Sequence, residues 1–295
     1  MSEARDEREA SDSGPSAGSA ERLSELERLA LPSVRLLHRA HARREAAELL
    51  GQLAHAPPSA AREILRARAA ALLERLKRVD EHTLGPLRAR LEAGELSRAE
   101  LDASVERLPK PDRDAFIEKL FDIEHTPTVP RKLAPNMTHY HPSPAWAALE
   151  VGRRLRPEDT FFELGSGLGK VMLVAALWSD AAVVGIELDE PLARASRERA
   201  GRLAPRVEIL IGDVRSFDLS RGTDFYLYTP FEGDVLDDVL LSLEAVAWKH
   251  PVRLWTLGRV TEMVARAGWV EPDLEIETLV RFRSTLLDPE PSAPD

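Results

Sequence analysis

Three glycines at alternate positions follow an acidic residue that ends a short apolar run. The stretch is Thr160-Phe-Phe-Glu163-Leu-Gly165-Ser-Gly167-Leu-Gly169-Lys170. The next eight residues, 171–178, are apolar at every position. This order predicts a buried parallel strand, a tight turn and a helix packed on a sheet. Glycine allows positive φ and lacks the β-carbon that would keep a ligand from the backbone. The stretch therefore predicts a ligand site with the carboxylate of Glu163 beside it.

The spacing of these glycines argues against two kinds of nucleotide site. The NAD-binding pattern Gly-x-Gly-x-x-Gly requires glycine where the chain has Lys170. A phosphate-binding loop requires Ser or Thr after its lysine, whereas Val171 follows Lys170 and Gly165 is one residue too close. The order acid-x-Gly-x-Gly-x-Gly resembles instead the first motif of class I S-adenosylmethionine (SAM) methyltransferases. The resemblance implies that SAM is the cofactor of this chain.

The resemblance also implies what each part of the glycine-rich stretch does. The acid would receive the ammonium group of SAM, and the glycines would make room for its methionine part. The residues assigned to this part of the cofactor are Glu163, Gly165, Ser166, Gly167 and Gly169.

Two further acids follow predicted strands. Residues 182–187 form a short apolar run that ends in Glu187, eighteen residues after Gly169, which is near the spacing at which an acid reaches a ribose. Its two oxygens can accept from both hydroxyls; the alternative is a solvent-exposed acid at a strand end. Asp213 follows a predicted strand at 206–211 and matches in position the adenine-binding acid of class I methyltransferases. The residues assigned to the nucleoside are Glu187, Leu188, Asp213 and Val214.

The acceptor side is expected after the fourth predicted strand, which begins at Asp224. Class I enzymes bind the methyl acceptor at the carboxyl end of this strand, and amine methylators often carry Asn/Asp-Pro-Pro-Tyr/Phe there. This chain has Thr229-Pro-Phe at 229–231. A proline-rich loop at 126–144 also carries Tyr140 between two histidines, of which the second is His141. No third ligand has suggestive spacing, so we expect no metal site and place Tyr140 and His141 beside the acceptor.

Four features in chain order carry a closer family resemblance. They are Tyr140-x-Pro-Ser-Pro144, Glu163-x-Gly-x-Gly-x-Gly169, Gly185-Ile-Glu-Leu188 and Tyr228-Thr-Pro-Phe231. This set resembles the bacterial branch of the histone lysine methyltransferase family named for disruption of telomeric silencing. The resemblance implies a nucleophilic, amine acceptor such as a protein lysine. Eukaryotic members have Asn where this chain has Thr229. Thr229 offers a hydroxyl at this position and lacks the amide group of Asn. The residues assigned to the acceptor side are Tyr140, Tyr228, Thr229 and Phe231.

Helical patterning dominates the first part of the chain. Leucines recur at spacings of three and four between residues 21 and 53, with Pro32 expected to divide the segment. A helix is predicted over 59–79, a turn at Gly85-Pro86 with a short helix after it, and a capping box at Ser97-x-x-Glu100. We expect a disordered tail at 1–20, a helical region at 21–125, a methyltransferase domain at 126–288 and a tail at 289–295. The domain is predicted to be α/β, with a doubly wound, mostly parallel, Rossmann-like sheet and an antiparallel terminal strand at 276–287.

Composition restricts the other function classes. The chain has 295 residues, no cysteine and a net charge of −10, most of it in the second half. Disulfides, thiolate metal sites and cysteine nucleophiles are therefore excluded. An acidic catalytic half lacks the basic face of a nucleic-acid binder, so specific nucleic-acid binding is not expected. No run of about 20 apolar residues is present, and no signal peptide is visible, so we expect a soluble cytoplasmic protein without a membrane partner.

Three alternatives remain beside a protein-lysine methyltransferase. The acceptor could be a small molecule, with the helical region as a lid. The chain could be a non-catalytic SAM-binding module that docks through its helices. An NAD-dependent oxidoreductase is the third, and Lys170 argues against it.

Overall fold

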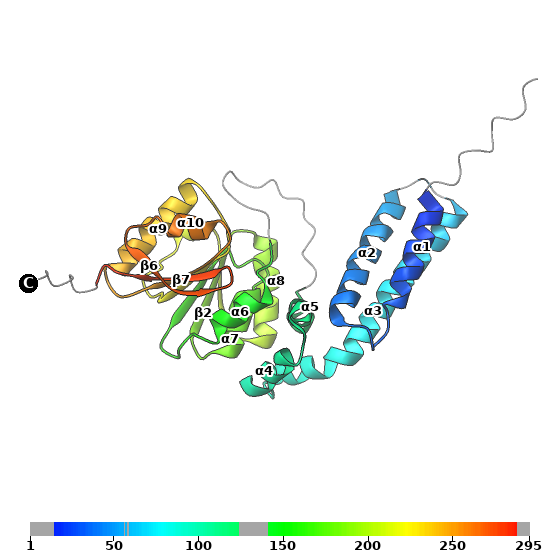
Figure 1. The fold of residues 1–295 in the computed structure, drawn as a ribbon, viewed down its shortest axis with the longest axis horizontal. Coiled ribbons are helices and arrows are strands. Elements are labelled where there is room, and N and C mark those ends of the chain that lie inside the picture. The colour runs from blue at the N-terminus through cyan, green and yellow to red at the C-terminus, as the bar shows by residue number, and fades with distance from the viewer. Residues whose placement is uncertain (1–14, 56, 58, 124–140, 288–295) are drawn as a thin grey trace, which may run out of the picture. The chain divides into compact units, whose positions relative to one another are not determined.

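The computed structural model describes residues 15–55, 57, 59–123 and 141–287. The chain forms two compact units. One contains the residues up to Arg90 together with Leu108–Leu120, and the other contains Leu91–Arg107 together with the residues from Phe121 onward. The first is helical and the second contains the sheet (Figure 1).

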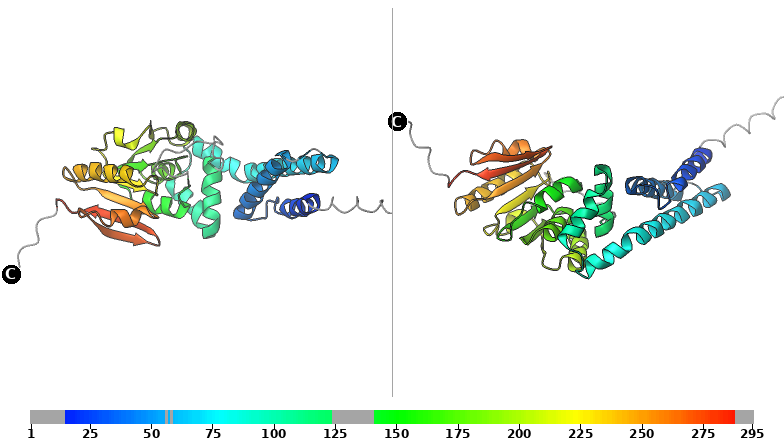
Figure 2. Two further views of the ribbon diagram at one scale, coloured as in Figure 1. Left: turned by 90° about the horizontal axis from the view of Figure 1, so that it is seen from above. Right: turned by 60° about the horizontal axis from the view of Figure 1, so that its bottom comes forward.

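The second unit contains a sheet of seven strands in the order β3-β2-β1-β4-β5-β7-β6. The strands are β1 (Thr160–Leu164), β2 (Ala182–Glu187), β3 (Glu208–Ile211), β4 (Asp224–Leu227), β5 (Arg253–Leu257), β6 (Val270–Ile276) and β7 (Leu279–Ser284). The pairs among β1 to β5 are parallel, and β7 pairs antiparallel with both β5 and β6. The orange and red strands β6 and β7 lie together at one edge in both views of Figure 2. The predicted doubly wound sheet with an antiparallel terminal strand is confirmed.

Helices of the second unit cover both faces of the sheet. They are α6 (Ala145–Gly152), α7 (Lys170–Trp178), α8 (Glu190–Leu203), α9 (Asp234–Ala247) and α10 (Val260–Val264), with a 3-10 turn at Val214–Ser216. The connections through α7 and α8 run along the sheet from β1 to β3, whereas those through α9 and α10 run the other way from β4. Right-handed crossovers therefore put the two sets of helices on opposite faces (Figure 1). The first β-strand lies where the direction changes, which is where ligands bind in open sheets of this kind.

Strand β6 was not predicted from the sequence. Most of its residues are exposed or half-buried, it contains Pro272, and its register with β7 shifts between Pro272 and Leu274. A strand at the edge of a sheet has one neighbour, so it needs neither an apolar run nor a complete set of backbone hydrogen bonds. The sequence of β6 therefore lacked the apolar pattern by which the other strands were predicted.

The described part of the first unit is helical. They are α1 (Pro15–Arg28), α2 (Leu36–His55), α3 (Ala60–Glu92, assigned to this unit up to Arg90) and α5 (Lys110–Phe121, assigned up to Leu120). A cluster of Leu and Ala side chains from α1, α2 and α3 forms its core. The predicted break at Gly85-Pro86 is wrong, because α3 continues through Pro86. Buried Leu84 and Leu91 lie seven residues apart on one face of the helix, and this continued burial outweighs the backbone hydrogen bond that proline cannot make.

Helix α4 (Arg98–Glu106) lies before residue 125, where the helical region is expected to end. It begins with the predicted capping box at Ser97 and Glu100, but it groups with the sheet unit. Its Asp102 accepts hydrogen bonds from the Arg153 guanidinium at 2.8 Å and from the Trp178 indole N–H at 2.6 Å. Polar contacts of this kind between distant segments are not visible as a sequence pattern, and the expected domain boundary at residue 125 stays a prediction. Among the described helices, none has both the length and the apolar character that a membrane crossing requires.

A buried ionic cluster joins three helices of the first unit. The Asp80 carboxylate on α3 accepts from the Arg39 guanidinium on α2 at 2.8 Å and from the Lys119 ammonium on α5. All three residues are less than 10% exposed. Removal of one partner from such a cluster leaves buried charge without compensation.

We therefore expect Asp80→Ala to lower the free energy of unfolding of the first unit by about 3 kcal/mol or more. Chemical denaturation followed by circular dichroism measures the change. Glu81→Ala is the matched control, because its exposed side chain pairs with Arg88 at the surface and should change stability by less than about 1 kcal/mol. Equal effects of the two substitutions would mean that burial does not control the contribution of Asp80.

Candidate functional site

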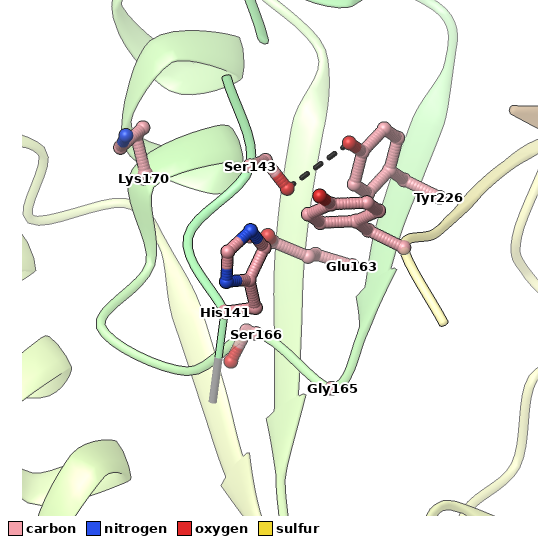
Figure 3. A pocket seen from close by; sticks show the side chains of 8 residues that line it. His141, Ser143, Glu163, Gly165, Ser166, Lys170 and Tyr226 are labelled. Atoms are coloured by element: carbon pink, nitrogen blue, oxygen red, sulfur yellow. Dashed lines mark hydrogen bonds between the residues drawn. The ribbon is translucent and has the colours of Figure 1, made fainter. Parts of the chain in front are cut away.

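A pocket lies at the carboxyl ends of the neighbouring strands β1 and β4. It is lined by His141, Ser143, Glu163, Gly165, Ser166, Lys170, Tyr226 and Tyr228 (Figure 3). These residues come from the segment before α6, the end of β1, the glycine-rich loop, the first turn of α7 and the end of β4. The sequence-predicted stretch at 163–170 therefore forms one wall of a pocket, and the predicted acceptor segment at 228 contributes to the other.

Glu163 is buried at the base of the pocket, where it also serves α7. Its side-chain oxygen accepts a hydrogen bond of 2.8 Å from the backbone N–H of Met172, in the first turn of that helix. The N-cap residue is Gly169, which has no side chain to cap the helix, so Glu163 takes over this task from the preceding strand. Burial raises the pKa of Glu163 to about 8, opposed by the bond from Met172 and by the charge of Lys170. A cation in the pocket would favour the ionised carboxylate.

The glycine-rich loop is packed too closely for side chains. Gly165 and Gly169 both have φ of 81°. A β-carbon at Gly165 would lie 2.4 Å from Cβ of Pro230, and one at Gly169 would lie 2.3 Å from Cε of Met172. The glycine at 165 thus lets the loop after β1 contact the turn after β4.

Glu187 holds the glycine-rich loop from the neighbouring strand. One of its oxygens accepts from the backbone N–H of Gly167 at 2.7 Å and the other accepts from that of Asp189 at 2.7 Å. Burial raises the pKa of this carboxyl, against the effect of the two backbone N–H groups. The acid therefore lies beside the loop, and Leu188 follows it half-buried. Its contact with a ribose stays a prediction.

Asp213 begins the 3-10 turn after β3. It accepts from the backbone N–H of Arg215 at 3.0 Å and pairs with the guanidinium of Arg215 at 2.7 Å; the hydrogen-bonding guanidinium lowers the pKa of the carboxyl. Val214 is buried in the core cluster that includes Phe225 and Leu227. Both residues therefore have structural partners, and their contacts with an adenine stay predictions.

The acceptor-side residues are placed in different environments. Tyr228 lines the pocket with its ring centroid 5.7 Å from that of His141. Thr229 is not among the lining residues; it has φ of 43°, and its hydroxyl donates to the Leu257 carbonyl at 3.4 Å. Phe231 is 4% exposed, and its side chain packs in the hydrophobic core. Tyr140 lies outside the described residues.

Sequence reasoning missed the pair formed by Tyr226 and Ser143. The Tyr226 hydroxyl donates to Oγ of Ser143 at 3.0 Å, and burial raises the pKa of this tyrosine (Figure 3). The period of two along β4 puts Tyr226 on the same face as Tyr228, and this signal could have found it. Ser143 comes from a segment far away in sequence, so the pairing itself left no sequence signal.

The pocket fits a polar ligand that carries a positive charge. Oγ of Ser166 is buried and has no hydrogen-bond partner, although buried hydroxyl groups normally have one. Glu163 lines the same pocket, and Gly165 of the loop is exposed. Among the described residues, no group of three His, Asp or Glu side chains could hold a metal ion.

One family of known proteins matches the part of the chain that contains the site. A family model described as Histone methylation protein DOT1 matches residues 150–228, the segment that contains the glycine-rich loop and Glu187. No curated protein matches the chain.

Three solved structures are among those similar to part of this chain. An RNA methyltransferase from Salinibacter ruber in complex with S-adenosyl-L-homocysteine is 25% identical over 53% of this chain and 99% of its own, with a TM-score of 0.38. A methyltransferase from Geobacter sulfurreducens is 17% identical over 63% of this chain and 95% of its own, with a TM-score of 0.41. TrmN from Thermus thermophilus is 21% identical over 48% of each chain, with a TM-score of 0.37.

The raised pKa of Glu163 predicts a pH-dependent contribution to stability. Between its ordinary pKa of 4.5 and its folded-state pKa of about 8, the folded protein keeps a proton that the unfolded chain releases. The free energy of unfolding of the ligand-free protein should therefore fall as pH rises through this window. Glu163→Gln removes the titrating group and keeps an acceptor for the Met172 N–H. We expect denaturant titrations at pH 5.5, 7 and 8.5 to show the wild type losing stability relative to Glu163→Gln as pH rises; parallel pH profiles would contradict the prediction.

Glu187→Gln tests the second acid. The amide retains one carbonyl oxygen, so it can no longer accept from Gly167 and Asp189 while also binding a ribose hydroxyl. We expect calorimetry to show SAM binding weakened by roughly 1.5–3 kcal/mol, the range for a lost charge-assisted hydrogen bond. Glu190→Gln is the control, because its exposed carboxylate pairs only along the surface of α8 with Arg194. An unchanged affinity in folded Glu187→Gln would remove this acid from the cofactor site.

Proposed function

We propose that this chain, a class I SAM-dependent methyltransferase whose residues 150–228 match the histone methylation DOT1 family, transfers the methyl group to an amine nitrogen, with protein lysine as the acceptor class. The observation that carries the proposal is the aromatic pair of Tyr228 and His141 at the pocket that contains Glu163. Aromatic faces attract ammonium groups and pack along the alkyl chain of a lysine. The matching family is described as one of histone methylation, which supports the same acceptor.

The residues present suit the cofactor. Glu163 would hold its ammonium group, Ser166 and the glycine backbone its methionine part, Glu187 and Leu188 its ribose, and Asp213 with Val214 its adenine. When bound, SAM supplies a methyl group on a sulfonium, which is already activated for transfer. The protein therefore has to align an acceptor, exclude water and keep the acceptor nitrogen unprotonated.

Tyr228 and Tyr226 have different tasks in this arrangement. Burial raises the pKa of Tyr228, so its hydroxyl stays protonated at neutral pH and can accept a hydrogen bond from an incoming amine without becoming a base. Tyr226 bonds to Ser143 and thereby holds the segment that carries His141. The acceptor would enter between these two elements, with its nitrogen directed toward the cofactor.

Methyl transfer from labelled SAM tests the acceptor class. The purified protein is incubated with SAM labelled at its methyl group and with lysate separated into protein, RNA and small-molecule fractions. We expect the label in protein, removable by protease and recovered as methyl-lysine after acid hydrolysis. Label that disappears with ribonuclease, or that stays in the small-molecule fraction, would replace the lysine acceptor by RNA or by a metabolite. Binding of SAM with no transfer to any fraction would support a non-catalytic module.

Thr229→Val separates the acceptor side from cofactor binding. The substitution keeps the branched shape at this strained turn and removes the hydroxyl that bonds to Leu257. We expect turnover with saturating acceptor to fall roughly three- to tenfold, the effect of one lost hydrogen bond. The Kd of SAM should stay within about twofold, because Thr229 does not line the pocket. If Thr229→Val turned over at the wild-type rate, Thr229 would have only a structural role in the turn, and Tyr228 would be left as the residue that contacts the acceptor.

A further inference from the structure

Helix α9 has an apolar row on its outward side. Its inward residues, among them Val239 and Leu243, pack in the hydrophobic core. On the other side Leu241 is 65% exposed, and Trp248, which follows the last turn with helical backbone angles, is 60% exposed. Ala245 between them is also exposed. Spacings of four and three residues put these three side chains on one side of the helix, and the row is called the α9 face.

Helix α8 of the same unit has an ordinary solvent-facing side. Its exposed side chains all carry charge: they are those of Glu190, Arg194, Arg197, Glu198 and Arg202. Among the described residues of the sheet unit, the large apolar residues exposed outside the α9 face are Met263 and Leu287. Single exposed apolar residues are common on protein surfaces, whereas a contiguous row of them marks an interaction surface. The α9 face therefore has the character of a docking surface.

The surroundings of the α9 face are acidic. Residues 231–249 contain five acids and one lysine. Asp234 and Asp237 lie in the first turn of α9, where carboxylates also suit the helix N-terminus, and Asp238 pairs with Arg215 at 3.1 Å. The acids alone would therefore not indicate a partner. Next to an exposed apolar row, however, they determine its charge, because a complementary surface has to be basic.

The direction of α9 connects this face to the acceptor side of the pocket. The helix joins the parallel strands β4 and β5, so it starts at the carboxyl edge of the sheet and runs back toward the amino edge (Figure 1). It follows the turn after β4, next to Tyr228, which lines the pocket. At a rise of about 1.5 Å per residue, Leu241 lies about 10 Å and Trp248 about 20 Å along the helix from Asp234. The acids thus lie toward the pocket edge, and the apolar row extends away from it.

We propose that the α9 face docks the protein acceptor through a basic amphipathic helix of that protein. The inference rests on the proposed lysine acceptor, because a lysine-bearing partner is the one whose charge matches the acids. Apolar side chains of the partner helix pack on Leu241, Ala245 and Trp248, since rows with this spacing interdigitate between helices. Its lysine and arginine side chains face Asp234 and Asp237, between the apolar contact and the pocket.

Binding of synthetic peptides tests the face without methyl transfer. Three dye-labelled peptides of equal length are compared: one with leucine at helical spacing among lysines, one with serine for leucine, and one with glutamate for lysine. Fluorescence anisotropy gives the Kd of each peptide for the full-length wild type, the double variant Leu241→Gln/Trp248→Gln, and Asp237→Lys. Met263→Gln and Glu262→Lys are the matched controls, because both residues are exposed on α10. Glutamine is compatible with a helix, and thermal unfolding shows whether each variant is folded.

The expected pattern depends on both the apolar row and the charge. The wild type should bind the leucine-lysine peptide at least about tenfold more tightly than the other two, because only that peptide matches the face in both respects. The double variant should weaken this binding at least about tenfold, as expected when an aromatic anchor is lost from the centre of an interface. Asp237→Lys should weaken it about three- to tenfold at low salt and less at high salt. Both controls should stay within about twofold of the wild type.

Three results would overturn the inference. Equal binding of the three peptides to the wild type would mean that the face selects neither charge nor apolar side chains. Unchanged binding to the double variant would place the contact elsewhere. A wild-type dimer that sedimentation shows to dissociate on Trp248→Gln would mean that a second copy of the chain covers the face.

The label experiment distinguishes failure of this inference from failure of the proposed function. With subsaturating protein fraction as acceptor, the double variant should lower the initial rate about tenfold and leave the Kd of SAM within about twofold, because Leu241 and Trp248 lie outside the pocket. Label that enters protein equally fast with the double variant would leave the lysine acceptor in place and remove the α9 face as its docking surface. Label that enters RNA or small molecules would overturn the lysine acceptor itself, and the inference with it.

Discussion

The hydrogen bond from the Met172 N–H to the Glu163 carboxylate is the contact on which the site depends. The loop between them must be glycine-rich to approach a ligand, and Gly169 therefore cannot cap the helix that follows. Glu163 supplies the missing acceptor from the end of β1, so one carboxylate both begins α7 and faces the pocket. A substitution here changes the fold and the site together, because one carboxyl group serves both.

Contacts between loops extend this dependence across the carboxyl edge of the sheet. Glu187 at the end of β2 holds the backbone of Gly167, and Gly165 makes room for Pro230 after β4. Tyr226 on β4 bonds to Ser143 before α6. The loops after three neighbouring strands and the segment before α6 are therefore fixed against one another. Such a framework places reacting groups accurately because it rests on rigid strands, and this is the main contribution that a protein makes to transfer of an already activated group.

The features that could be predicted from the sequence are those fixed by local residue types. The strands that contain Glu163 and Glu187 each combine an apolar run with an acid near the carboxyl end, and alternate glycines follow the first of them. The features that could not be predicted depend on distant partners. Helix α3 passes through Pro86 because burial continues on both sides, and β6 pairs with β7 although it is largely exposed. The same reasoning covers the contact of Thr229 with Leu257 and the packing of Phe231 in the core, which also depend on distant partners. The assignment of both residues to the acceptor side stays a prediction.

Buried charge occurs in both units, and the two cases differ in how fully they are satisfied. In the helical unit, the Asp80 carboxylate lies between Arg39 and Lys119, and the described hydrogen bonds compensate its burial from within the protein. In the pocket, Glu163 has one backbone donor, burial shifts its pKa to about 8, and the neighbouring Ser166 hydroxyl has no partner. A closed ionic cluster stabilises a fold, whereas polar groups left incomplete in a pocket gain their interactions only when a ligand arrives. The buried Glu163 and Ser166 side chains therefore lower the stability of the ligand-free protein. A ligand of matching charge would bind more tightly because it completes their interactions.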